Sequence, residues 1–162
     1  MRRRTALAAA AALSLAVGCP SAYQRTYDKE MQTLEQRRQQ DETQQKAAHA
    51  EASKYAAVVY FEVGSAVVGA DGQRELRWLV GKLQPYPQAV LLVQGFADTT
   101  GTEAKNTTLS SDRAQAVATY LQSQGIPPAR LVVQGYGTAS PAASNTSAKG
   151  RERNRRVEVT IQ

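Results

Sequence analysis

The chain has 162 residues and a formal net charge of +6, because 20 Lys and Arg residues stand against 14 Asp and Glu residues. This length accommodates one ordinary domain with appendages and excludes two full-sized domains. A basic balance can indicate nucleic acid binding. Here the basic residues are scattered and the chain begins like an exported protein, so we expect no nucleic acid partner.

Residues 1–18 predict an export signal peptide. A cluster of three arginines at residues 2–4 precedes an apolar run at residues 6–17, which is too short to span a bilayer as a stable helix. Removing the three arginines leaves 17 basic residues against 14 acidic ones, a net charge of +3. The basic excess of the mature chain is therefore small.

The only cysteine, Cys19, directly follows this apolar run. A lone thiol in an exported protein cannot form an internal disulfide. With Ala16 and Gly18 before it, the segment resembles the lipobox of bacterial lipoproteins, in which cleavage leaves the cysteine as an acylated N-terminus. The alternative is an incidental residue in a discarded signal. The resemblance implies a lipid anchor at Cys19, and Pro20 in place of aspartate implies sorting to the outer membrane.

Residues 19–55 predict a polar helical tether. Gln, Glu, Arg, Lys and Ala dominate this segment, which has no proline or glycine after Pro20. Tyr27, Met31 and Leu34 fall on one face like a coiled-coil seam, but polar residues continue that face. We expect a solvated single helix or partly disordered spacer on the order of 50 Å long, and leave a weak self-association seam open. The single histidine, His49, is expected to be solvated.

Residues 56–162 predict a small two-layer α/β domain with the order β-α-β-α-β-β, its helices packed on one mixed sheet. Runs of β-branched and aromatic residues indicate the strands, and apolar residues at helical spacing indicate the helices. Asp71 is a candidate helix N-cap. The strands are expected at residues 57–63, 89–94, 130–134 and 156–161, the helices near residues 76–83 and 109–124, and a polar loop up to residue 149.

The domain has no recognisable catalytic motif. It contains no Gly-x-Ser-x-Gly elbow, no Walker-type phosphate loop, no catalytic cysteine and no usable histidine. Glu62 and Asp98 are the only carboxylates that the strand ends could bring together, and no tight acidic cluster offers metal ligands. We therefore expect a non-enzymatic protein without cofactor or metal.

Asp98 and Arg113 are the candidates for a binding site. Asp98 follows the carboxyl end of a predicted strand, where open α/β folds tend to place ligands. Arg113 lies on the apolar stripe of the following helix, four residues after Leu109 and four before Val117. One interpretation is a site for a zwitterion, which offers an ammonium to the carboxylate and a carboxylate to the guanidinium. The other is an internal ion pair that fixes the loop to the helix.

An ordered series of motifs resembles the OmpA-like C-terminal family, which includes peptidoglycan-associated lipoprotein and the periplasmic parts of flagellar stator proteins. The strand with Glu62 resembles the family's opening strand, so the resemblance covers roughly residues 56–162. The matching segments are residues 95–101 (Gly-Phe-Ala-Asp-Thr-Thr-Gly), 106–110 (Asn-Thr-Thr-Leu-Ser), 113–114 (Arg-Ala), 125–126 (Gly-Ile), 130–131 (Arg-Leu), 135–137 (Gly-Tyr-Gly), Pro141, Asn145 and 150–158 (Gly-Arg-Glu-Arg-Asn-Arg-Arg-Val-Glu).

The resemblance implies non-covalent binding of peptidoglycan through the diaminopimelate of its stem peptide. By this analogy Asp98 accepts the ammonium and Arg113 holds the carboxylate. Asn106 and Thr100 are expected in the loop around the pocket. Two further residues, Asn154 and Arg155, are expected either to close the rim or to orient the last strand, with a pairing to Glu158 in the second case.

Two positions depart from the family pattern. Phe96 and Ala97 replace the usual His-Thr before the aspartate, and Glu62 stands where aspartate is common. Because Asp98 and Arg113 are retained, we expect binding to persist with altered affinity. The resulting function is that of a lipid-anchored outer-membrane protein that ties the membrane to the cell wall. The alternative is an anchoring subunit of a larger envelope assembly, with partners bound to the spacer helix.

Overall fold

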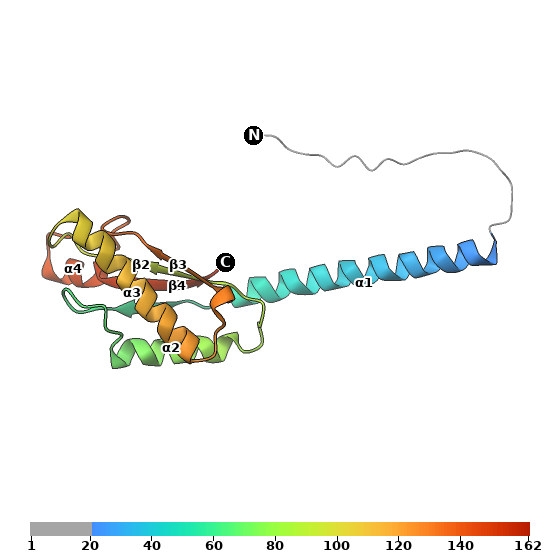
Figure 1. The fold of residues 1–162 in the computed structure, drawn as a ribbon, viewed down its shortest axis with the longest axis horizontal. Helices are drawn as coiled ribbons and strands as arrows, with labels where there is room; N and C mark the ends of the chain where they lie inside the picture. Colours follow the sequence, from blue (N-terminus) through green and yellow to red (C-terminus); the bar gives the residue numbers. More distant parts are fainter. Residues whose placement is uncertain (1–20) are drawn as a thin grey trace, which may run out of the picture. The chain divides into compact units, whose positions relative to one another are not determined.

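The computed structural model describes residues 21–162 (Figure 1). The expected signal peptide and the lipidation site Cys19 lie outside the described residues. The chain divides into two compact units, one up to Glu42 and one from Thr43 to Gln162. None of the helices in the described part is both long and apolar enough to cross a membrane.

Helix α1 (Ala22–Ala52) confirms the helical spacer that the composition predicts. Its residues are exposed except for Ala52, as its polar sequence requires. Arg38 forms an ion pair with Glu35 one turn earlier at 2.7 Å, and such exposed pairs add only a few tenths of a kcal/mol each. The helix thus owes its stability mainly to high propensity along its length.

Four strands form one mixed sheet in the order β1-β4-β2-β3. Strands β2 and β3 are parallel, as their connection through a helix requires, and β4 runs antiparallel to both of its neighbours. This confirms the predicted mixed sheet. The strands are β1 (Ala57–Tyr60), β2 (Leu91–Gly95), β3 (Leu131–Gly135) and β4 (Arg156–Ile161).

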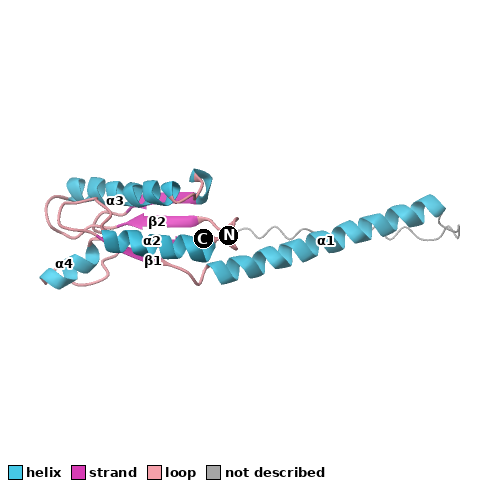
Figure 2. Cartoon of the chain, turned by 90° about the horizontal axis from the view of Figure 1, so that it is seen from below, coloured by secondary structure: helices cyan, strands magenta, loops and turns pink. Residues whose placement is uncertain are grey.

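Helices α2 (Ala70–Leu83) and α3 (Glu103–Ser123) pack on this sheet, α2 against β1 and α3 against β2, β3 and β4 (Figures 1 and 2). Successive side chains of a strand point to opposite faces of the sheet. One face is buried beneath the helices, while Val58, Tyr60 and Val132 remain exposed. The large apolar side chains that are fully buried include those of Val59, Leu76, Leu79, Leu91, Val93, Val117, Leu121, Val157 and Val159. The predicted two-layer architecture is confirmed.

The expected start of α3 near Leu109 is wrong, because the helix begins at Glu103. Thr102 caps it by accepting a hydrogen bond from the backbone N–H of Lys105. The first turns carry mostly polar, exposed residues, so the apolar periodicity does not reveal them. As a consequence Asn106 lies on the helix and not in a loop.

Two further expectations about helices need correction. Asp71 is not an N-cap: Gly69 occupies that position, and Asp71 pairs with Arg74 within the first turn of α2. The short helix α4 (Ala148–Asn154) begins within the last residues of the predicted polar loop and continues beyond its expected end at residue 149. In the chain it comes after the 3₁₀ turn at Pro128–Arg130 and strand β3. Ser147 caps α4 by accepting a hydrogen bond from Gly150 N–H at 3.0 Å, a cap that the Ser-Ala-Lys-Gly sequence permits.

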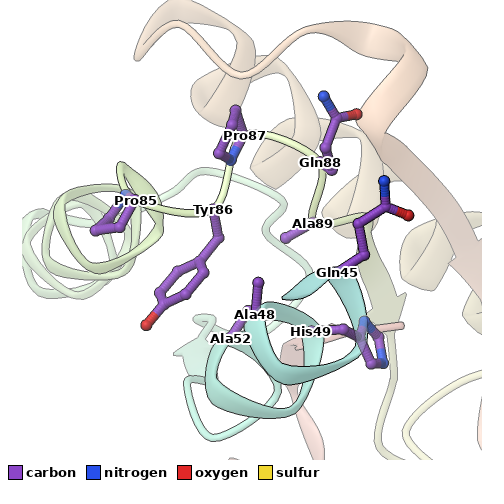
Figure 3. A pocket seen from close by; sticks show the side chains of 9 residues that line it. All are labelled: Gln45, Ala48, His49, Ala52, Pro85, Tyr86, Pro87, Gln88 and Ala89. Atoms are coloured by element: carbon purple, nitrogen blue, oxygen red, sulfur yellow. The ribbon is translucent and has the colours of Figure 1, made fainter. Parts of the chain in front are cut away.

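The last turns of α1 belong to the second compact unit. There they border the loop that follows α2, and a cavity of about 390 Å³ lies between the two segments (Figure 3). Ala52 is fully buried at this contact, whereas His49 lines the cavity and stays exposed. The contact anchors the end of α1 on the domain. The lining residues are Gln45, Ala48, His49, Ala52, Pro85, Tyr86, Pro87, Gln88 and Ala89.

Candidate binding site

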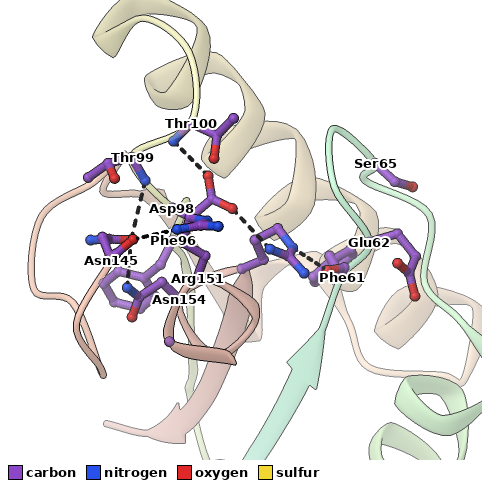
Figure 4. Close-up of polar contacts among 12 residues, drawn as sticks. Phe61, Glu62, Ser65, Phe96, Asp98, Thr99, Thr100, Asn145, Arg151 and Asn154 are labelled. Carbon is purple, nitrogen blue, oxygen red and sulfur yellow. Dashed lines mark hydrogen bonds and ion pairs between the residues drawn. The ribbon is translucent and has the colours of Figure 1, made fainter. Parts of the chain in front are cut away.

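Asp98 lies just beyond β2 and is only 6% exposed. One carboxylate oxygen, Oδ1, accepts a hydrogen bond from the backbone N–H of Thr100 at 2.8 Å. The other, Oδ2, accepts one from Nη1 of Arg155 at 3.0 Å, which makes an ion pair. Figure 4 shows the hydrogen bond that joins the carboxylate to the backbone of Thr100. Both oxygens therefore have a partner within the protein.

These partners keep Asp98 ionised despite its enclosure. Burial by itself raises the pKa of a carboxyl group, because it disfavours the charged form. At Asp98 the hydrogen bonds from Thr100 and Arg155 together with the charge of Arg155 outweigh burial, so the pKa lies below the ordinary value of 3.8. The site thus presents a fixed negative charge at neutral pH.

Arg113 is fully buried and binds backbone carbonyl groups. Its Nε donates to Ser65 O at 2.8 Å, Nη1 to Phe96 O at 3.2 Å and Nη2 to Glu62 O at 3.0 Å. The guanidinium also lies 5.3 Å from the centre of the Phe61 ring. Arg113 therefore ties the loop after β1 to the end of β2.

The charge of Arg113 is unfavourable in this enclosed position. Burial, and to a lesser extent the nearby charge of Arg155, lowers the pKa of Arg113 to about 10, while Asp98 acts in the opposite direction. Arg113 nevertheless remains protonated at neutral pH. Two guanidinium groups and one carboxylate therefore share this small region.

The structure brings Asp98 and Arg113 into electrostatic contact without joining them. Within residues 21–162 no ion pair links the two, and the role of the internal partner falls to Arg155. The Glu62 side chain is exposed and points away from Asp98 (Figure 4). The pairing expected between the Asn-Arg-Arg segment and Glu158 is made by Arg156, at 2.6 Å.

Asn154 is fully buried and holds the loop before α4. Its amide donates to Ala143 O at 2.8 Å and to Asn145 Oδ1 at 2.8 Å, and its Oδ1 accepts from Ala143 N–H at 3.0 Å. Asn145 Oδ1 also accepts from the backbone N–H of Thr99 at 3.3 Å (Figure 4). Asn154 and Asn145 thereby position the turn that carries Asp98.

Thr100 and Asn106 differ in how they are available to a ligand. Thr100 is exposed and supplies its backbone N–H to Asp98. Asn106, on α3, is only 4% exposed, and its side chain makes no hydrogen bond to any residue of the described chain. Within residues 21–162, Arg156 Nη1 is the only side-chain nitrogen or oxygen atom that is both fully enclosed and without a hydrogen bond. The unpaired side-chain amide atoms of Asn106 are therefore not fully enclosed. An unpaired amide at this depth is a candidate ligand contact.

Phe96 and Ala97, the departures nearest to Asp98, both point into packed structure. Phe96 is 5% exposed; its ring stacks on Tyr136 at 5.4 Å, and the Arg156 guanidinium lies 4.1 Å from its centre. Ala97 is 4% exposed, and its N–H donates to Gly137 O at 2.7 Å. These residues extend the core up to Asp98.

Arg155 borders two surface cavities, and Asp98 lines neither of them. One, of about 440 Å³, is lined by Val63, Ala148, Lys149, Arg151, Glu152 and Arg155. The other, of about 750 Å³, includes Glu62, Asp71, Glu75 and Glu152 in its lining. No group of three or more metal-ligating side chains occurs in residues 21–162.

Comparisons with known proteins agree with the fold and the motifs. The OmpA family model matches residues 60–155, more than half of the chain. Probable lipoprotein YiaD of Escherichia coli is 40% identical over 103 residues, which cover 64% of this chain and 47% of that protein. Peptidoglycan-binding protein ArfA of Mycobacterium tuberculosis is 37% identical over 98 residues, 60% of this chain and 30% of that protein. The chain thus spans half or less of these relatives.

A solved structure extends the comparison to three dimensions. The peptidoglycan-associated lipoprotein from Burkholderia pseudomallei has a TM-score of 0.63 and 30% sequence identity, over 65% of this chain and 90% of that chain. Sequence motifs, family match and fold agree, and this chain belongs to the OmpA family.

Proposed function

We propose that this protein binds peptidoglycan non-covalently and ties a membrane to the cell wall. The observation that carries the proposal is the enclosed, ionised Asp98 beside two guanidinium groups, of Arg113 and Arg155. A carboxylate that keeps its charge accepts an ammonium, and the guanidinium pair attracts a carboxylate. A ligand carrying both groups matches this arrangement.

Diaminopimelate in the stem peptide of peptidoglycan is such a ligand. Its free end is an α-amino acid, with an ammonium and a carboxylate on one carbon. Asp98 takes the ammonium, while Arg113 supplies positive charge from beneath and holds the surrounding loops through its three carbonyl bonds. Asn106 offers an unpaired amide. Thr100, Asn154 and Arg155 form or position the rim of the site.

The names of similar proteins support the wall as the target. One relative is described as peptidoglycan-binding, and one structural neighbour as a peptidoglycan-associated lipoprotein. Another relative is described as a probable lipoprotein. The same domain in proteins with these descriptions favours binding over catalysis, in line with the lack of catalytic motifs in the sequence.

The membrane end of the tether is the lipidated N-terminus. We propose acylation at Cys19, outer-membrane sorting through Pro20, and a spacer formed by α1 on the periplasmic side. At about 1.5 Å per residue, a helix of 31 residues reaches on the order of 45 Å. The exposed polar surface of α1 suits an aqueous compartment.

A pull-down on purified diaminopimelate-type peptidoglycan tests the site. Asp98→Asn removes the negative charge with little change in shape, and we expect at least a tenfold loss of bound protein. Asp112→Asn is the matched control, because Asp112 is an exposed aspartate on α3, and it should bind like the parent. Equal binding of the parent and Asp98→Asn would disprove the site.

Arg113→Lys is the second test variant. A lysine ammonium cannot reach three carbonyl groups at once, and unsatisfied buried acceptors cost about 1–3 kcal/mol each. We expect a fall in the free energy of unfolding of about 2–4 kcal/mol, measured by urea denaturation, together with weaker wall binding. Unchanged stability would contradict the supporting role of Arg113.

An anchoring subunit of a larger envelope assembly is the second candidate function. The observation in its favour is an apolar row on α1, in which Tyr27, Met31 and Leu34 are 49%, 48% and 57% exposed. A partner helix could cover this row. Photo-cross-linking from position 31 in intact cells identifies such a partner, and the absence of any cross-linked product argues against this function.

A further inference from the structure

The ion pair between Asp98 and Arg155 occupies the place that a ligand ammonium needs. Asp98 is 6% exposed, and its Oδ2 is already held by Arg155 Nη1 at 3.0 Å. Arg155 is held in turn by a bond from its Nε to Phe61 O at 3.0 Å. A ligand that approaches Asp98 therefore meets Arg155 first.

We propose that Arg155 determines the specificity of this site by exchanging carboxylate partners. When the ligand's ammonium takes Asp98, the Arg155 guanidinium moves its contact from Asp98 to the ligand's own carboxylate. No covalent bond changes, and one internal ion pair becomes two ion pairs with the ligand. The inference rests on the proposed function, because it concerns the ligand of the same site.

Charge balance explains why this exchange selects a zwitterion. A simple amine that displaces Arg155 leaves a guanidinium without a partner, next to the buried guanidinium of Arg113. That crowding is already costly, since the charge of Arg155 contributes to the lowered pKa of Arg113. A zwitterion adds no net charge and supplies the missing carboxylate. An anion alone leaves Asp98 without a cation and is repelled by it.

The surroundings of Arg155 permit the movement. Its side chain is 11% exposed, in contrast to that of Arg113. It borders the two cavities of about 440 and 750 Å³, so the guanidinium has free space on the side away from Asp98. Its Nη2 makes no hydrogen bond to another residue of the described chain and is free to donate to a ligand. Only a side-chain rotation is needed.

The ligand that satisfies both Asp98 and Arg155 is a free α-amino acid end, with ammonium and carboxylate on the same carbon, as in diaminopimelate. A stem peptide with lysine at that position ends in an ammonium alone. Arg155 therefore discriminates against lysine-type walls, and it is available for this role because the donors of Arg113 are already engaged by three carbonyl groups.

Calorimetric titration with three probes of matched carbon chain tests the exchange. Meso-diaminopimelate carries both groups, cadaverine carries only the two ammonium groups, and pimelate carries only the two carboxylates. The full chain is compared with Arg155→Gln and with Arg153→Gln, an exposed arginine of α4 that serves as the control. Asp98→Asn tests the underlying site in the same assay.

We expect the unaltered protein to bind diaminopimelate at least tenfold more tightly than cadaverine or pimelate. In Arg155→Gln, cadaverine should bind several-fold more tightly than to the parent, and the preference for diaminopimelate should shrink at least tenfold. Arg153→Gln should match the parent. If cadaverine binding is unchanged or weaker in Arg155→Gln, the exchange is disproved while the binding site stands.

Two outcomes separate failure of the inference from failure of the proposed function. If diaminopimelate binds Asp98→Asn as tightly as the parent, or does not bind the parent, the proposed function fails and the exchange with it. If Arg155→Gln does not fold, the exchange is tested in the unaltered protein by following the NMR resonance of the Arg155 side-chain Nε–H during ligand titration. A shift on addition of diaminopimelate but not of cadaverine supports the exchange, and no shift with diaminopimelate overturns it.

Discussion

Asp98 is buried and yet keeps its negative charge, because Thr100 and Arg155 stabilise the ionised carboxylate. The turn back to Thr100 is local and follows from the short side chain of aspartate, which readily bonds to the backbone two residues on. The ion pair with Arg155 joins residues 57 positions apart and depends on the tertiary fold. The first contact is local in the chain, whereas the second cannot be seen in a short sequence window.

The titration of Asp98 provides a residue-scale prediction. Because the folded-state pKa lies below 3.8, the ionised form stabilises the fold above the unfolded pKa, and this stabilisation is lost as the pH falls through the folded pKa. We expect the Asp98 carboxyl carbon, followed by NMR, to titrate below pH 3.8 in the parent. In Arg155→Gln its midpoint should rise. A parent midpoint above the ordinary value would contradict the assigned hydrogen bonds.

At the scale of elements, α3 approaches the sheet unusually closely. A Cβ at Gly95 would lie 2.0 Å from Ser110 O, and one at Gly135 would lie 2.6 Å from Ser111 N. Both glycines end strands that pair side by side. Ser110 then accepts a hydrogen bond from Gly137 N–H at 2.8 Å. This close packing fixes α3, and with it Arg113, relative to Asp98.

Substitution of Gly95 tests this packing. Gly95→Ala places a methyl group against a backbone oxygen that cannot move independently, so we expect a loss of about 1–3 kcal/mol or more in the free energy of unfolding. Gly81→Ala is the control on exposed α2, where nothing lies within 4 Å of the added methyl group. It should stabilise by about 0.5–1 kcal/mol. Thermal unfolding of both variants measures the contrast, and equal effects would rule out the close approach.

Element boundaries show where periodicity is informative. The core face of α2 was predictable because apolar residues recur at helical spacing, and that of β4 because apolar and polar residues alternate. The first turns of α3 and the whole of α4 expose mostly polar residues, so capping by Thr102 and Ser147 is the only local indication of their starts. Periodicity therefore does not reveal that Arg155, at the end of α4, faces Asp98.

At the scale of the whole molecule, the proposed function separates into a membrane end and a wall end. The membrane end depends on Cys19, which lies outside the described residues. The wall end depends on the compact unit from Thr43 to Gln162. Because the two ends use different residues, each can be removed without the other.

Cell fractionation tests this separation. Cys19→Ser removes the acylated residue, so we expect the protein to leave the membrane fraction while purified wall still retains it. Asp98→Asn should show the reverse: the protein stays in the membrane fraction and is no longer retained by purified wall. If Cys19→Ser remains in the membrane fraction after detergent-free washing, the lipid anchor is wrong.

The sequence by itself determined the family, the two-layer fold and the helical spacer, and it singled out Asp98 and Arg113, because each depends on composition, periodicity or motifs within a short window. Only the tertiary structure decided how the charges pair. Arg113 binds three carbonyl groups from distant segments, whereas Arg155 takes Asp98. The sequence alone does not distinguish which of several arginines pairs with Asp98. The packing of α3 and β4 against the sheet determines which guanidinium is enclosed and which reaches the carboxylate.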